Sequence, residues 1–405
     1  MKKNYIMGVI ACAALTMTSC SNDEIGGNNT KQGDPIEFGV YLGRDAQGSR
    51  GTIITTDNLT KFGVTAYLEP SVTPDFMYNQ EVIKNADGSW TYSPVKYWPT
   101  METQGYKNHS ISFYAYAPHT SDAHSLITHS GNNDEEHTAP TITISLPTGA
   151  NADLANMVDF VATTNHFEYK TNGSNGVSNK VTFNLKHEMT RIDLKAQVNE
   201  NVYGSTVANR TKVVIRSIKL KSCGEFYTKA DYNFPQLMQD RGTWSNRTQA
   251  RTDTDFDLQS ILNLSRDTWT ISGKDIISST NKGIALEGTS PVNLFNTDQY
   301  LFLIPAKNET GLTAKSISAT ITYDIITEDS NLEDGYSKTS ATKTVYLPAG
   351  IMQQGKAYNL TFTIAVDQVK LDATVEPKWN TDTNSDIDVP YTPDDATVIH
   401  NQKQN

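Results

Sequence analysis

Apolar and polar residues alternate in two short runs near the start of the chain. One run covers positions 36 to 42, and the other covers positions 61 to 68. The alternating apolar residues are Ile36, Phe38, Val40, Leu42, Phe62, Val64, Ala66 and Leu68. Because successive side chains of a strand point to opposite faces, each run predicts a half-buried β-strand.

The segment between these two runs has the composition of an exposed loop. It contains glycines at positions 43, 48 and 51 and a serine at 49, residue types that break strands and leave the backbone accessible. It also contains two arginines, Arg44 and Arg50. We therefore expect an arginine-specific protease to find a substrate in this segment.

Short alternating runs continue along the chain, separated by turns rich in Gly, Pro, Asn and Asp. The further predicted strands are 90–92, 111–117, 141–146, 160–164, 181–185, 191–198, 212–220, 299–304, 317–326, 342–347 and 357–366. Only residues 152–157 and 255–264 suggest a short helical turn, and the remainder of 224–296 is expected to form loops and short edge strands. The predicted fold class is all-β with little helix.

The clearest break in composition is TNGSNGVSN at residues 171–179, which lacks a large apolar side chain. It predicts an N-terminal β-sandwich over residues 35–178 and a C-terminal β-sandwich over residues 179–380. The alternative is a long hairpin loop inside one larger sandwich.

The first residues have the layout of an export signal. Lys2 and Lys3 precede an apolar run from Ile6 to Leu15, which is too short for a permanent membrane-spanning helix. Residues 17–20, Met-Thr-Ser-Cys, are a near match to a lipoprotein signal-peptidase site, so we expect a signal peptide over residues 1–19 and lipidation of Cys20. The alternative is an ordinary secretory signal with an incidental cysteine.

Residues 20–34 are expected to form a flexible tether because they are rich in Gly, Asn and Ser. Within them, Ser-Asn-Asp-Glu at 21–24 resembles the acidic signal that directs some lipoproteins to the outer face of the outer membrane. The alternative is that this tetrapeptide is only part of a polar tether.

Charge and cysteine content narrow the class of protein further. Removal of Lys2 and Lys3 with the signal leaves 32 of the 34 Lys and Arg side chains against 45 Asp and Glu, a formal net charge of −13. An acidic chain without a basic stripe argues against nucleic-acid binding. Of the cysteines, Cys12 leaves with the signal and Cys20 is lipidated, so Cys223 has no partner for an internal disulfide.

No catalytic motif with a recognisable spacing occurs, so we expect no enzymatic activity, no cofactor and no metal. A loop does concentrate imidazole groups, which are suitable zinc ligands; the histidines are His109, His119, His124, His129 and His137. Their spacing matches no known metal-binding pattern, and a solvated insertion between two strands is the favoured interpretation.

Aromatic residues are dense enough between positions 90 and 116 to suggest stacking on sugars. They are Trp90, Tyr92, Tyr97, Trp98, Tyr114 and Tyr116. Burial in a core is the more usual use of such side chains, and we favour it here.

Taken in chain order, these features resemble the fimbrillin family of outer-membrane-anchored pilus subunits. The resemblance rests on Cys20, on Arg50-Gly51 followed by Phe62-Gly63-Val64, on PVKYWP at 94–99 followed by ISFYAYAP at 111–118, on 181–193 with Lys186-His187, and on GKAYN at 355–359. It spans nearly the whole chain. No single motif is diagnostic, but their order and spacing together are fairly specific.

The resemblance implies two transthyretin-like β-sandwiches in tandem and assembly by strand exchange. A protease would cut at Arg50, or alternatively at Arg44, and the strand of Ile36, Phe38, Val40 and Leu42 would leave. Arg50 is favoured because Ser49 and Gly51 flank it, whereas Asp45 follows Arg44 directly. A strand from the next subunit would then fill the vacated groove.

The C-terminal end departs from the family pattern. Residues 375–379 resemble the family's closing strand, but the chain continues as a polar tract over 381–405. Ile387, Val389 and Tyr391 alternate weakly, so two interpretations stay open with at least equal weight on the second: a donor strand for a neighbouring subunit, and a disordered tail.

The expected function is therefore that of a surface-exposed lipoprotein that serves as stalk, tip or anchor of a fimbria and supports cell adhesion. Its expected partners are other pilus subunits, the outer membrane through the lipid on Cys20, and a host or bacterial surface ligand. The alternative is a monomeric outer-membrane lipoprotein that binds glycans.

Overall fold

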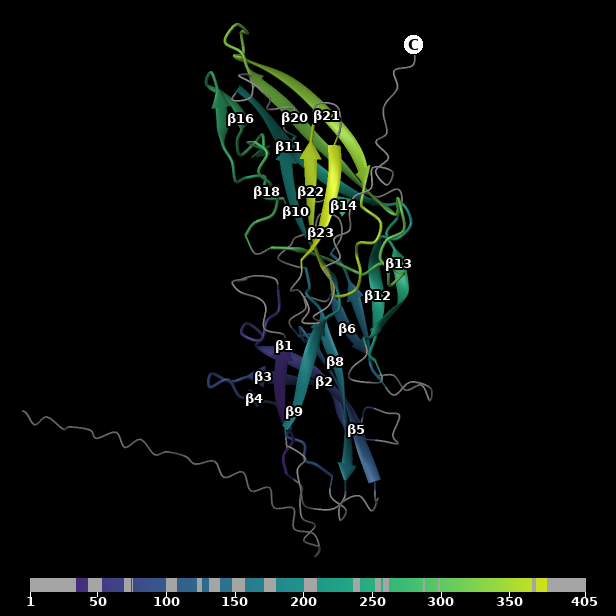
Figure 1. Cartoon of the computed structure of the whole chain (residues 1–405). Coiled ribbons are helices and arrows are strands. Elements are labelled where there is room, and N and C mark those ends of the chain that lie inside the picture. Colours follow the sequence, from purple (N-terminus) through teal and green to yellow (C-terminus); the bar gives the residue numbers. More distant parts are fainter. Residues whose placement is uncertain are drawn as a thin grey trace, which may run out of the picture.

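The described part of the chain is built from β-strands and the loops that join them. The computed structural model describes residues 34–42, 53–68, 74, 76–99, 108–121, 126–130, 139–147, 157–170, 180–199, 210–235, 241–251, 256–257, 262–286, 288–297, 299–365 and 369–376. These residues form 23 strands and contain no α-helix, and among them no helix could span a membrane. The all-β fold class is confirmed. Figure 1 shows the strands in two groups, one above the other.

The lower group in Figure 1 contains a seven-stranded sheet in the order β1-β9-β8-β5-β2-β3-β4. Its strands are β1 (Glu37–Leu42), β2 (Lys61–Leu68), β3 (Met77–Lys84), β4 (Trp90–Thr91), β5 (Asn108–Ala117), β8 (Val161–Lys170) and β9 (Lys180–His187). β1 runs parallel to β9, and the other pairs are antiparallel. The two alternating runs at positions 36–42 and 61–68 thus correspond to strands β1 and β2.

This sheet curls until its two ends approach each other. β1 and β4 are the end strands, yet they are in contact. Just beyond β4, the Lys96 carbonyl accepts a hydrogen bond of 2.9 Å from the Ile36 amide, and Pro35 forms a β-bridge with Tyr97. The concave side encloses an apolar core drawn mainly from β1, β2, β5 and β9. β1 therefore closes the sheet around this core.

A four-stranded sheet packs on the other face of the curled sheet, in the order β13-β12-β7-β6. Its strands are β6 (Ile127–Ser130), β7 (Thr141–Ser145), β12 (Tyr227–Asn233) and β13 (Thr243–Gln249). Successive residues of β5 consequently enter two different cores. Phe113 and Ala115 face the concave side, whereas Tyr114 and Tyr116 face the four-stranded sheet.

The upper group of strands contains two five-stranded sheets and one small hairpin. One sheet comprises β10 (Thr190–Val198), β18 (Val292–Asn293), β19 (Leu301–Leu303), β22 (Ala357–Ile364) and β23 (Val369–Glu376). The other comprises β11 (Thr211–Ser222), β14 (Phe256–Asp257), β17 (Ile284–Leu286), β20 (Ile317–Glu328) and β21 (Tyr336–Tyr346). The hairpin joins β15 (Trp269–Ile271) to β16 (Lys274–Ile277).

The helical turn expected within residues 255–264 does not include positions 256 and 257. Phe256 and Asp257 form strand β14 and pair with Leu220 and Lys219 of β11, while residues 255 and 258–261 lie outside the described residues. Pairing with a long neighbouring strand outweighs the weak helical pattern of a short segment. Of the other expected turn, residues 152–156 lie outside the described residues.

Strand pairing crosses the boundary expected at residues 171–179. β9 follows that segment, yet it pairs with β8 and β1, and β12 pairs with β7. Residues 171–179 thus connect the antiparallel partners β8 and β9, which agrees with the alternative of a hairpin loop. Strand pairing crosses the predicted limit between residues 178 and 179, and the domain division into 35–178 and 179–380 remains a prediction.

The turn between β9 and β10 lies where the two groups of strands meet. It contains Glu188, whose backbone carbonyl accepts a hydrogen bond of 3.2 Å from the Trp244 indole of β13. Its carboxylate accepts a hydrogen bond from the Gln354 amide, which also donates to the Gly242 carbonyl. Gln354 belongs to the upper group and Trp244 to the lower, so Glu188 joins the two.

The Glu188 carboxyl is buried, with 1% of the residue exposed. Burial disfavours the charged form and raises the pKa of Glu188 to about 7, although nearby Arg241 and the Gln354 hydrogen bond act in the opposite direction. Tyr232 also lies against this carboxyl, and burial raises its pKa well above the ordinary value. The junction thus contains a carboxyl that gains or loses its proton near neutral pH.

Glu188→Gln should change how stability depends on pH. Between pH 4.5 and 7 the folded wild type keeps a proton that the unfolded chain has lost, so its free energy of unfolding should fall as pH rises, by up to about 1.4 kcal/mol per pH unit. The variant lacks this contribution, so the free energy of unfolding of the variant should rise relative to that of the wild type as pH increases to 7. Urea unfolding of both proteins from pH 5 to 8 measures the difference. Parallel pH profiles would contradict a buried, titrating Glu188.

Candidate functional site

The structure describes only part of the site predicted from the sequence. Cys20, Arg44, Arg50 and the tail 381–405 lie outside the described residues, so the predictions on them remain predictions. The predicted removable strand is described and forms β1. The candidate functional site is therefore β1 together with the groove that it fills.

The side chains of β1 alternate between core and solvent as the sequence predicts. Ile36, Phe38 and Leu42 are 2–3% exposed, and Val40 is partly buried against the same core. Tyr41, on the opposite face, is 46% exposed. β1 thus contributes one complete apolar face to the interior of the curled sheet.

Phe38 occupies the centre of that interior. Its ring centroid lies 5.0 Å from that of Tyr92, 5.7 Å from Phe183, 6.1 Å from Phe113 and 6.3 Å from Phe62. These rings come from β9, β5 and β2 and from the residue after β4. Aromatic pairs at such separations add to the free energy gained from apolar burial. One side chain of β1 therefore holds together rings from across the sheet.

The backbone of β1 is held along its length and at both ends. Residues 37–42 pair in register with residues 180–185 of β9. At one end the Tyr92 hydroxyl donates a hydrogen bond of 2.9 Å to the Ile36 carbonyl. At the other end Thr56 Oγ1 donates to the Leu42 carbonyl at 2.8 Å and accepts from the Leu42 amide at 3.0 Å. The closed position of β1 is therefore well defined.

The residues that follow the predicted loop are fastened separately. Ile53 is 3% exposed, and the Ile54 amide donates a hydrogen bond of 2.7 Å to Asp159 Oδ2. The other carboxylate oxygen of Asp159 lies 2.9 Å from His187 Nδ1 at the end of β9. Ile53 and Ile54 are thus anchored beside the start of β8 and the end of β9 by contacts that do not involve β1.

Departure of β1 would create an apolar groove with an unpaired edge. The pairing partner of residues 180–185 among the described residues is β1, so their backbone groups would lose that ladder. Val181, Phe183 and Leu185 would also lose their cover. An added strand satisfies both needs at once, because it supplies backbone hydrogen bonds and alternate apolar side chains.

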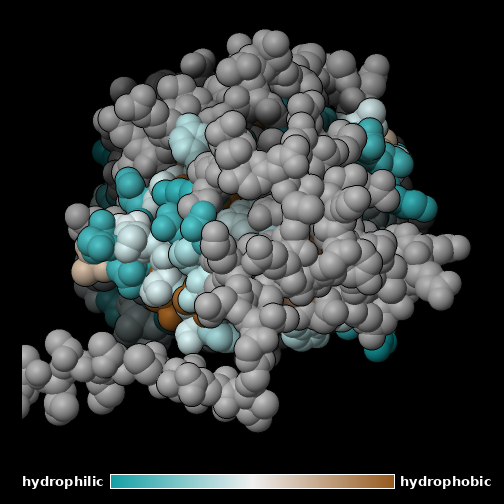
Figure 2. Space-filling model, turned by 90° about the horizontal axis from the view of Figure 1, so that it is seen from below, coloured by the Kyte–Doolittle hydropathy of each residue, from teal (hydrophilic) through white to brown (hydrophobic). Residues whose placement is uncertain are grey.

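Some described residues are visible when the molecule is seen from below. Figure 2 shows mainly hydrophilic side chains among the described residues there, with small apolar areas between them. The large apolar side chains that the structure does expose include Tyr41, Ile83, Val95 and Tyr97.

The two described histidine side chains of the predicted cluster serve packing. His119 and His129 both stack on the Tyr116 ring, at 6.2 and 6.0 Å between centroids. His129 Nε2 lies 2.7 Å from the Thr65 hydroxyl, and burial lowers the pKa of His129 to about 4. Within the described residues no cluster of metal-ligating groups forms. The side chains of His109, His124 and His137 lie outside the description.

Four of the six aromatic residues considered for sugar stacking are core residues. Tyr92, Trp98, Tyr114 and Tyr116 are at most 8% exposed. Trp90 is partly buried against Phe62, with 4.9 Å between ring centroids. Tyr97 is 38% exposed. These residues therefore do not form an exposed stacking platform.

Sequence reasoning missed the polar groups that brace the site. One end of β1 is fixed by Thr56, and the chain after it is fixed by Asp159 together with His187. These three residues lie far apart in sequence and belong to no motif. His187 did appear in the sequence resemblance through Lys186-His187, although its role was not foreseen. Only the fold brings its ring to Asp159.

The fold is that of an all-β protein in which the end strand β1 closes a curled sheet. The model of the family described as fimbrillin-like matches residues 49–379, which is more than half of the chain. The chain belongs to the fimbrillin-like family. β1 lies before the matched region.

Several solved structures are similar to the chain, and the first of those named here shares its fold. A fimbrial protein from Bacteroides vulgatus is 24% identical, with 84% of this chain and 98% of that chain covered and a TM-score of 0.64. A putative cell adhesion protein from Bacteroides ovatus is 14% identical, with coverage of 85% and 97% and a TM-score of 0.40. The C-terminally truncated tip fimbrial protein Mfa3 from Porphyromonas gingivalis is 10% identical, with coverage of 78% and 93% and a TM-score of 0.31. No curated protein matches the chain.

Phe38→Ala should destabilise the packing of β1 far more than Val40→Ala, a substitution on the same strand. Loss of the central ring should lower the free energy of unfolding by about 3–5 kcal/mol, as for other buried Phe-to-Ala changes. Val40→Ala, on the same strand but only partly buried, is the matched control and should cost less than half as much. Urea unfolding measures stability, and hydrogen exchange of the amides of residues 180–185 reports on β1 itself. Equal effects of the two substitutions would contradict the central role of Phe38.

Proposed function

We propose that the chain is a surface-exposed lipoprotein that serves as a fimbrial subunit and supports cell adhesion. Membership of the fimbrillin-like family supports this function, and it also supports a structural rather than an enzymatic role. The observation that carries the proposal is β1. This strand fills an apolar groove, and Ile53 and Ile54, which follow the predicted loop, are held by contacts that do not involve it.

Assembly begins with a cut in the loop that joins β1 to β2. Arg50 is the favoured site and Arg44 the alternative. After a cut at Arg50, Ile53 remains buried and Ile54 remains bound to Asp159, so the body of the subunit keeps its fold near the new end. β1 is then tethered only by noncovalent contacts and leaves.

A strand of another subunit replaces β1. The groove presents the edge of β9 and the aromatic rings that surround Phe38, and a donor strand with alternate apolar residues satisfies both. The segment 381–405, with Ile387, Val389 and Tyr391 at alternate positions, is the proposed donor. Each subunit thereby acts as acceptor at one place and donor at another, which permits a fibre.

The proposed partners follow from this scheme. Other pilus subunits bind through strand exchange, and the lipid on Cys20 attaches the subunit to the outer membrane before the cut. A subunit that loses β1 joins the stalk, whereas one that keeps β1 serves as an anchor or a tip. The burial of Tyr92, Trp98, Tyr114 and Tyr116 argues against the alternative of a glycan binder that uses these residues.

Arg50→Ala should prevent polymerisation without unfolding the subunit. Wild-type material on cells should begin near Gly51 and run as a ladder in detergent, because each groove holds a neighbour's strand. The variant should begin at Cys20 and run as a monomer. N-terminal sequencing, gel electrophoresis and electron microscopy of the producing cells provide the measurement.

Arg44→Ala is the matched control for that experiment, because it removes an arginine from the same loop and should leave the ladder intact. If Arg50→Ala still yields fibres and Arg44→Ala does not, the cut lies at Arg44. Fibres from the double variant would refute cleavage at either arginine. Wild-type cells that carry only uncut monomers would restrict the protein to the anchor role.

Cys20→Ala should abolish lipidation and surface display. Without the thiol there is no site for the diacylglyceryl group, so the precursor should not reach the outer membrane. Metabolic labelling with a fatty-acid analogue and protease accessibility on intact cells measure the two effects. Cys223→Ala is the control and should label normally. Full surface display of the Cys20 variant would refute the lipid anchor.

A further inference from the structure

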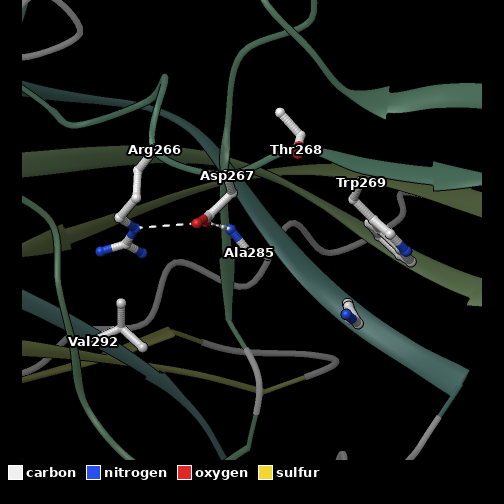
Figure 3. Close-up of a pocket in the computed structure, with 7 residues that line it drawn as sticks. Arg266, Asp267, Thr268, Trp269, Ala285 and Val292 are labelled. Carbon is white, nitrogen blue, oxygen red and sulfur yellow. Dashed lines mark hydrogen bonds and ion pairs between the residues drawn. The ribbon is translucent and has the colours of Figure 1, made fainter.

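A polar pocket opens in the upper group of strands, away from β1. It lies beside the β15–β16 hairpin and has a volume of about 440 Å³. This volume falls within the range of roughly 300–1,000 Å³ that small-molecule sites occupy. Its lining residues are Lys212, Arg266, Asp267, Thr268, Trp269, Ala285 and Val292. They come from β11, β15, β17 and β18 and from the segment before β15 (Figure 3).

The guanidinium of Arg266 is held in place from two directions. Arg266 Nη1 donates a hydrogen bond of 2.8 Å to the Asn293 carbonyl, and Nε donates to Asp267 Oδ1 at 3.3 Å. Among the described residues, the Nη2 group takes part in neither bond. A guanidinium fixed on one side in this way presents its remaining donors in a set direction.

Asp267 fixes the position of the Arg266 guanidinium. Its Oδ2 accepts a hydrogen bond of 2.9 Å from the Ala285 amide of β17, while its Oδ1 accepts from Arg266 (Figure 3). The aspartate therefore ties the guanidinium to the backbone of a buried strand. With Arg266 and Lys212 against Asp267, the charged side chains of the lining sum to one positive charge.

Trp269 lines another part of the pocket. Figure 3 shows its ring on the far side of Asp267 from Arg266. The indole packs partly against a small apolar cluster that includes Ile271 and Ile276, and Lys212 Nζ lies 4.9 Å from its ring centroid. The ring is thus held by its surroundings while part of it remains accessible in the pocket.

We propose that this pocket binds a sugar unit that carries a carboxylate, such as a uronic acid or a sialic acid in a surface glycan. The free side of the Arg266 guanidinium matches a carboxylate. The Trp269 ring offers a flat apolar surface to the face of a pyranose ring, and the Thr268 hydroxyl offers a hydrogen-bond partner to a sugar hydroxyl.

The charge of the whole chain favours a small, singly charged unit over a polyanion. The chain has a formal net charge of −11, so a nucleic acid or a highly sulfated polymer is repelled as it approaches. A single carboxylate meets this repulsion only weakly, and the local cations offset it.

The proposal does not depend on strand exchange. The pocket is built from strands other than β1 and β9, so a subunit presents it both before and after β1 leaves. It uses Trp269 and Arg266 rather than the aromatic residues between positions 90 and 116. Failure of polymerisation in Arg50→Ala would therefore leave the pocket intact.

The test uses the full chain and a pair of ligands that differ in one group. Methyl β-D-glucuronide carries the carboxylate, and methyl β-D-glucoside has the same ring without it. Calorimetry and tryptophan fluorescence should detect the glucuronide with at least tenfold tighter binding than the glucoside. N-acetylneuraminic acid as a second probe shows which acidic sugar fits better.

Two variants and a control locate the binding. Arg266→Gln should weaken glucuronide binding at least tenfold, and Trp269→Leu should weaken it and abolish the fluorescence change. Lys274→Gln removes an exposed cation of the same hairpin, which pairs with Asp334, and should bind as the wild type does. Thermal unfolding confirms that each variant is folded.

Three outcomes would overturn the proposal. The first is equal binding of the glucoside and the glucuronide by the wild type, which requires no variant. The second is unchanged glucuronide binding by a folded Arg266→Gln. The third is binding of a short acidic peptide, acetyl-Gly-Glu, more tightly than either acidic sugar, which would assign the pocket to a peptide carboxylate instead.

Discussion

The parallel pairing of β1 with β9, together with the burial of Phe38, closes a sheet that otherwise has two free ends. Backbone pairing alone would leave the apolar interior open to water at that edge, and apolar contact alone would not fix the register of the strand. Both interactions reside in one six-residue segment. The same segment is therefore the most important for closing the subunit and the simplest to replace as a unit.

The rest of the molecule makes such a replacement tolerable. The chain after β1 is anchored by Ile53 and by the Ile54 hydrogen bond to Asp159, and the reverse face of the sheet packs on a second sheet. That second core continues into the upper group of strands, across the turn that holds Glu188. An opened groove would thus disturb one core while the larger core remains covered.

The two proposed activities occupy different parts of the fold. The strand-exchange groove belongs to the curled sheet, and the carboxylate pocket belongs to the β15–β16 hairpin and its neighbours in the upper group. This separation allows assembly and ligand binding to vary independently. In a fibre, each subunit would present its own pocket, and many weak sites on one fibre raise the effective affinity for a glycan-covered surface.

Local sequence pattern predicted the existence and type of many strands but not all of them. The alternation in 36–42 and 61–68 reports burial of one face, which neighbouring residues reveal by themselves. The sequence pattern did not predict strands β3, β12 and β13, because polar residues interrupt their apolar alternation, as in Thr243–Gln249, TWSNRTQ. Their status as strands depends on partners elsewhere in the chain.

By itself, the sequence determined the all-β class and the apolar face of β1, because each depends on residues close together in the chain. It also determined the family resemblance, which depends on short motifs and their order along the chain. The tertiary structure alone decided that β1 runs parallel to β9, that β9 and β12 join strands from before residue 171, and that Tyr114 and Tyr116 enter a second core. It also brought His187 to Asp159 and Lys212 to the ring of Trp269. These arrangements join residues far apart in sequence, and periodicity along one strand does not specify its partner.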